Sequence, residues 1–145
     1  MDLDELIASI KKHFAILFEE HGFTIWKAFK TGQCGATMSV ILKSDNCKIR
    51  ILSEMVVGLA FGIEDSDDQY LGYSPEERWW SADSLDAFLK QQTIDPWIFP
   101  AKVSDEGIAE LAIRFESSLE EMIEMMKLAQ NWREEFDGFY KGESE

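Results

Sequence analysis

The sequence predicts a single α+β domain over residues 1–145: an N-terminal helix, a four-stranded antiparallel meander, a short helix, and a long C-terminal amphipathic helix packed on the sheet. A chain of 145 residues is the usual size of one domain and is long enough to bury a sizeable core. A hydrophobic content of 46% excludes general disorder. Helical periodicity at both ends, with strand-like alternation between them, sets the order of the elements.

Both ends of the chain carry the periodicity of an amphipathic helix. Residues 2–20 place apolar side chains three or four positions apart, and Gly22 supplies a left-handed stop just beyond them. Residues 104–137 repeat this spacing, with Ser104 as the expected N-cap and glutamates on the opposite side. A shorter helix is expected over residues 81–92. We expect the helices to cover mainly one face of the sheet.

The middle of the chain has the pattern of strands. Residues 23–63 predict four antiparallel strands joined by short turns. Residues 47–52 alternate, so Ile49 and Ile51 are expected on one side of their strand and Lys48 and Arg50 on the other. Residues 64–78 predict an acidic loop, and residues 93–103 predict an extended connector that contains two prolines.

The formal net charge of −14 is unevenly distributed along the chain. Residues 1–63 hold seven acidic and seven basic side chains and are neutral, whereas residues 64–86 hold eight acidic side chains and one arginine. Residues 104–137 hold ten acidic and three basic side chains. Such a field repels nucleic acid and anionic lipid and attracts basic proteins. We therefore expect a basic protein partner, and neither a nucleic-acid nor a membrane partner.

The acidic loop and the tryptophans that follow it form the candidate partner-binding surface. Adjacent residues of an extended segment point to opposite sides, so one tryptophan is expected in the core. The other lies either at the surface, as an anchor for Arg or Lys, or packed with the first under the short helix that follows. A solvated loop and a cation site are the alternatives, although an EF-hand alignment on Asp65 places Tyr70 where glycine is needed. The residues of this candidate surface are Glu64, Asp65, Asp67, Asp68, Trp79 and Trp80.

A cluster of methionines marks a second candidate surface. Met122, Met125 and Met126 lie on the apolar side of the predicted C-terminal helix, and Trp132 extends this side. Methionine-rich helix faces are adaptable binding surfaces, and they also fill gaps in cores. A predicted helix of some thirty residues is about 50 Å long, more than one sheet covers, which favours a homodimer contact at these residues.

Catalytic and cofactor signals are weak. His13 and His21 lie eight residues apart on one predicted helix, too far for a shared metal. Cys34 and Cys47 lack CxxC spacing and are interpreted as reduced thiols, with a disulfide between them as the other interpretation. The acidic N-terminus does not resemble a signal peptide, and no apolar run is long enough to cross a membrane. We expect a cytoplasmic protein with no catalytic residues, no bound metal and no cofactor.

The layout of a helix ending in HGF, an antiparallel meander and the segment RWWSADSLDAFL resembles small acidic bacterial proteins of the toxin-immunity type over residues 10–92. This resemblance implies an inhibitor that masks a basic toxin with carboxylates. Small size, acidity and α+β content also resemble type III secretion chaperones, which interleave a helix among their strands where this chain has four predicted strands in succession.

The leading expectation is therefore a non-enzymatic protein-binding domain, of the immunity or chaperone kind, that recognises a basic partner through an acidic surface. Two alternatives remain at this point. One is a small enzyme or metal-binding protein whose site is assembled by the fold, with Cys34 or the acidic loop as its centre. The other is a structural homodimer without a ligand, in which the acidic exterior maintains solubility.

Overall fold

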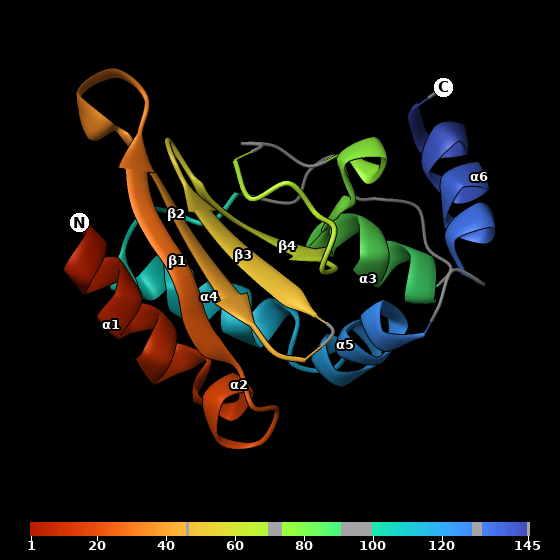
Figure 1. Ribbon diagram of the computed structural model, residues 1–145, viewed down its shortest axis with the longest axis horizontal. Coiled ribbons are helices and arrows are strands. Elements are labelled where there is room, and N and C mark those ends of the chain that lie inside the picture. Colours follow the sequence, from red (N-terminus) through yellow and green to blue (C-terminus); the bar gives the residue numbers. More distant parts are fainter. Residues whose placement is uncertain (46, 70–73, 91–99, 129–131, 145) are drawn as a thin grey trace.

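A five-stranded antiparallel sheet lies at the centre of the domain, and its strands follow one another in sequence order (Figure 1). The computed structural model describes residues 1–45, 47–69, 74–90, 100–128 and 132–144. The predicted connector 93–103 therefore lies mostly outside the described residues. The strands are β1 (Thr24–Thr31), β2 (Thr37–Lys43), β3 (Lys48–Ser53), β4 (Val57–Gly62) and β5 (Trp79–Ser81).

The helices gather mainly on one face of this sheet, which confirms the predicted α+β class (Figure 1). None of the helices among the described residues is long and apolar enough to cross a membrane. The helices are α1 (Leu3–His13), α2 (Ala15–Glu19), α3 (Ala82–Lys90), α4 (Asp105–Arg114), α5 (Leu119–Lys127) and α6 (Arg133–Ser144), with short 3-10 turns η1 (Gln33–Gly35) and η2 (Pro75–Glu77).

The prediction of one long C-terminal helix over residues 104–137 is wrong, because the chain forms three helices, α4, α5 and α6, in this region. Ser104 caps α4 as expected, with its side chain accepting from the Gly107 N–H at 3.0 Å. The helix ends at Phe115, and a turn through Ser118 leads into α5. The Ser118 N–H donates to the Phe115 carbonyl at 3.1 Å, which closes this turn. Each segment can then turn along the sheet and bury its own apolar side.

The N-terminal helix is also divided. Residues 2–20 form α1 and α2, with a break at Phe14 whose φ of −110° and ψ of 32° are not helical. Phe14 is buried, so the break turns its ring inward. Gly22 has a φ of 70° and provides the left-handed stop that the sequence predicts.

The sheet has five strands, one more than the four that the sequence predicts. β5 pairs with β4, with Phe61 opposite Trp80 and Gly62 opposite Trp79. At three residues it is too short to show a period in the sequence. The two tryptophans lie on opposite faces: Trp80 belongs to the main core under the helices, and Trp79 belongs to a smaller cluster on the other face. We call this second side the outer face.

Two helical glycines offer a test of this arrangement, because one has a crowded Cβ position and the other has an open one. The carbonyl group of Lys102 occupies the place that a Cβ would take at Gly107, whereas nothing lies within 4 Å of that place at Gly138. We expect Gly107→Ala to lower the free energy of unfolding by about 2 kcal/mol or more. Gly138→Ala, on an exposed helix, should raise it by about 0.5–1 kcal/mol.

Urea denaturation followed by tryptophan fluorescence measures both changes. Shifts of the two midpoints in the same direction would contradict the contact between Lys102 and the first turn of α4.

Candidate functional site

The acidic loop predicted as a partner surface is folded over two buried cations on the outer face. Lys48 and Arg50 are 4% and 0% exposed. The Lys48 ammonium donates to the carbonyls of Glu64 and Ser66 at 3.1 and 3.4 Å and to Asp68 Oδ1 at 2.8 Å. The Arg50 guanidinium donates to the Asp68 carbonyl at 2.8 Å. Residues 63–69, which we call the covering loop, thus supply the partners that buried cations require.

Asp68 is the central acceptor of this layer. Its second oxygen, Oδ2, accepts from the Lys27 ammonium at 2.8 Å and from Trp26 Nε1 at 3.2 Å. Burial by itself would raise the pKa of Asp68, but the hydrogen bonds from Lys27, Lys48 and Trp26 outweigh it and lower the pKa from 3.8 to about 2. The carboxylate is therefore held in its charged form by side chains of β1 and β3.

Of the two interpretations of the tryptophan pair, the one with an exposed anchor is wrong, and both rings are packed. Trp79 is 0% exposed and Trp80 is 3% exposed. The two residues do point to opposite sides of the sheet, but the covering loop closes the outer face over Trp79. Trp79 Nε1 donates to the Asp67 carbonyl at 2.8 Å, and the Arg50 guanidinium lies 4.2 Å from its ring centre. Neither ring is available as an anchor for a partner.

The remaining acidic side chains of the covering loop also meet the chain's own groups. Glu64 pairs with Lys43 at 3.0 Å, and Asp65 pairs with Arg78 at 3.0 Å. Asp67 Oδ1 accepts from the backbone N–H of Gln69. Because local cations screen its charge, this loop projects a weaker negative field than the sequence suggests.

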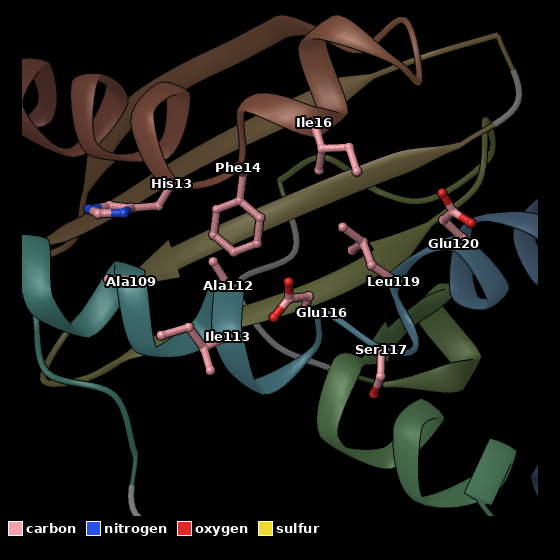
Figure 2. A pocket seen from close by; sticks show the side chains of 10 residues that line it. All are labelled: His13, Phe14, Ile16, Ala109, Ala112, Ile113, Glu116, Ser117, Leu119 and Glu120. Atoms are coloured by element: carbon pink, nitrogen blue, oxygen red, sulfur yellow. The ribbon is translucent and has the colours of Figure 1, made fainter.

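A groove lies between helices α1, α2, α4 and α5 (Figure 2). It has a volume of about 400 Å³, within the range of small ligand pockets. We call it the helix groove. Figure 2 shows Phe14 and Ile16 facing α4 and α5 across the opening. Its lining residues are His13, Phe14, Ile16, Ala109, Ala112, Ile113, Glu116, Ser117, Leu119 and Glu120.

One end of the helix groove is fixed by a cluster around Asp105, at the start of α4. Its Oδ1 accepts from the Ser9 hydroxyl at 2.7 Å and lies 3.0 Å from His13 Nε2, and its Oδ2 lies 3.4 Å from Lys12. The hydrogen bonds from Ser9 and then from His13 lower the pKa of Asp105. These contacts hold α4 against α1 and so keep the groove's walls in place.

The walls of the helix groove combine exposed apolar and acidic side chains. Ile113 is 72% exposed and Ile16 is 38% exposed. Glu116 and Glu120 lie beside them, and Glu106 and Glu110 lie nearby on α4. Among the described residues, Glu106, Glu110 and Glu116 form no ion pair, in contrast to the acids of the covering loop. The unneutralised charge therefore lies on the helices.

The sequence interpretation missed the helix groove because its walls come from opposite ends of the chain. Ile16 and Ile113 are the signal that was available, since each is a large apolar residue that lies off the apolar side of its predicted helix. Both are exposed in the structure.

The predicted dimer surface is also corrected. Met122, Met125 and Met126 are 0%, 7% and 4% exposed and belong to the main core. Trp132 is partly buried, donates to the Met125 carbonyl at 2.6 Å and packs edge-on against Trp80. The breaks in the C-terminal segment let this apolar side turn into the domain, so the methionines fill the core and do not form a surface.

The two cysteines differ in their surroundings. Cys34 is exposed, and Cys47 is buried; both are free thiols. Burial raises the pKa of Cys47 to about 12, which keeps its thiol protonated and unreactive. Cys34 lies in η1, at the far end of β1 from α2 (Figure 1).

Replacing Asp68 with asparagine removes the negative charge between Lys27 and Lys48. We expect Asp68→Asn to lower the free energy of unfolding at pH 7 by about 2–4 kcal/mol, because it leaves a buried cation without its counterion. Asp65→Asn, which breaks only the exposed pair with Arg78, should cost less than about 1 kcal/mol. Urea denaturation measures both, and equal losses would contradict the central position of Asp68.

The same substitution should change how stability depends on acid. The folded pKa of Asp68 is depressed to about 2, so its stabilisation is present above about pH 4 and is lost as the pH falls toward 2. The original protein should therefore lose more stability over this window than Asp68→Asn does. Parallel acid profiles for the two proteins would argue against a charged Asp68 in the fold.

Comparisons of this chain with protein-family models, with curated proteins and with solved structures found no match. The similarity to immunity proteins and secretion chaperones therefore stays a prediction.

Proposed function

We propose that this protein is a binding domain that takes a basic, amphipathic segment of a partner protein into the helix groove. The observation that carries the proposal is an apolar groove beside Glu106, Glu110 and Glu116, which form no ion pair among the described residues. Apolar walls of this kind accommodate large aliphatic or aromatic side chains. The surrounding glutamates complement lysine or arginine on the same segment.

Charge favours a basic partner over a second copy of this chain. The segment 104–127 holds seven acidic and two basic side chains. A symmetric dimer through this face would bring the same carboxylates together from both copies, which is unfavourable. A basic segment instead gains from every glutamate that it approaches, and the field raises its rate of association.

The proposal changes where binding takes place and keeps the predicted class of partner. The covering loop uses its acids to neutralise Lys27, Lys43, Lys48 and Arg78, so the acids of α4 and α5 are better suited to attract a partner. An immunity-type inhibitor and a chaperone would both use such a surface. The first would block a basic functional surface of its target, and the second would shield an exposed amphipathic helix.

Selection from a random peptide library tests the proposal without a known partner. We expect the selected peptides to be rich in lysine or arginine and to carry large apolar residues at helical spacing. Glu116→Lys should weaken their binding about tenfold and reduce its salt dependence, because it reverses a charge at the groove. Ile113→Asp should weaken it by a similar factor, because it places a charge on the apolar wall.

Glu54→Lys is the matched control. Glu54 is exposed in the turn between β3 and β4, so this substitution makes the same change of net charge away from the groove. Its affinity for the peptides should stay within about twofold of the original. Selected peptides that bind the Glu116→Lys and Ile113→Asp proteins as tightly as the original protein would exclude the helix groove as the site.

A further inference from the structure

Three metal-ligating side chains converge where α2 ends and α5 begins. Glu20 and His21 close the α2 segment, and Glu120 lies in the first turn of α5. One ligand atom from each residue lies within 4.8 Å of the other two. His21 Nε2 and Glu120 Oε1 are 3.8 Å apart. The residues are separated by some hundred positions in the sequence, so only the fold brings them together.

The Nε2 atom of His21 lacks a hydrogen-bond partner among the described residues. This nitrogen is also buried. A buried nitrogen without a partner is unfavourable, because it has given up water and gained nothing. In the neutral tautomer whose proton is on Nδ1, Nε2 carries a lone pair that can bind a proton or a metal ion.

The corner that carries two of the ligands is held firmly. The Phe23 N–H donates to the Leu17 carbonyl at 3.0 Å, which closes the end of α2 around Gly22. Leu17 and Phe23 are both buried and anchor this turn in the main core. His21 is therefore positioned by the backbone, and the exposed carboxylates of Glu20 and Glu120 need only small rotations to reach a shared ion.

The carboxylates also need a positive charge. No lysine or arginine among the described residues forms an ion pair with Glu20 or Glu120. Two carboxylates this close repel each other unless a cation lies between them.

We propose that Glu20, His21 and Glu120 form a binding site for a zinc-like divalent cation. One imidazole nitrogen and two carboxylate oxygens match the ligands of zinc, which binds both at about 2.0–2.2 Å. Calcium and magnesium favour sites made of oxygen alone, so the imidazole selects against them. Three protein ligands leave a coordination position open to solvent. Glu120 lies at the α5 end of the helix groove (Figure 2), so this position is next to the groove.

Isothermal titration with zinc chloride tests this site directly. The full chain is used without a histidine tag, after EDTA treatment, and with Cys34→Ser to remove the exposed thiol. We expect one zinc ion per chain and a rise in Tm when zinc is present. Magnesium chloride at the same concentrations should bind at least tenfold more weakly.

The variants identify the ligands. His21→Ala and Glu120→Gln should each weaken zinc binding at least tenfold. Glu54→Gln is the control, because it removes an exposed carboxylate in the turn between β3 and β4 and leaves the three ligands in place, and its zinc affinity should be unchanged. Glu120→Gln alters an exposed side chain, so it tests the site even where His21→Ala does not fold.

Zinc affinity that is unchanged in Glu120→Gln, equal binding of magnesium, or no saturable zinc binding would each overturn the proposal. The titration contains no peptide and leaves Glu116 and Ile113 intact, so its result is independent of whether the helix groove binds a basic segment.

Discussion

The burial of Lys48 and Arg50 beneath the covering loop is the constraint on which much of this structure depends. Lysine and arginine are almost never fully buried unless they are paired. Here they lie on the central strand of the sheet, on the face away from the helices. The loop must therefore fold back to bring Asp68 and a set of carbonyl groups over them. The Trp79 ring completes the layer by stacking on Arg50.

This layer also fixes the register of the sheet. Side chains alternate along a strand, so moving β3 by one residue would drive two cations into the main core and bring Ile49 and Ile51 out of it. Gly62 belongs to the same arrangement, because a Cβ there would meet Ser66 Oγ at 2.7 Å and the Trp79 ring at 2.8 Å. Buried ion pairs contribute little net stability compared with apolar packing, and their value lies in excluding other arrangements.

The same layer decides where the charge of the protein acts. Asp68, Glu64 and Asp65 face cations of the chain itself, so much of the negative charge in the first acidic segment is neutralised internally. Glu106, Glu110 and Glu116 form no ion pair within the described part of the chain, and they lie near exposed apolar side chains of the helices. Breaks near Phe14 and Ser118 give the helices the directions that open the groove between them. The surface that we propose for binding thus depends on two helix interruptions and on the acids beside them.

The sequence by itself determined the α+β class, the alternation of β3, the cap at Ser104 and the stop at Gly22, because each depends on residues close together in the chain. It did not determine which acids stay available, which tryptophans are covered or where the long apolar segment breaks. Those features depend on partners far apart in sequence, such as Lys27 and Asp68, which are 41 positions apart, or His21 and Glu120. Local sequence patterns indicate whether a segment forms a helix or a strand. Burial and ion pairing depend instead on which distant residues the tertiary fold places against that segment.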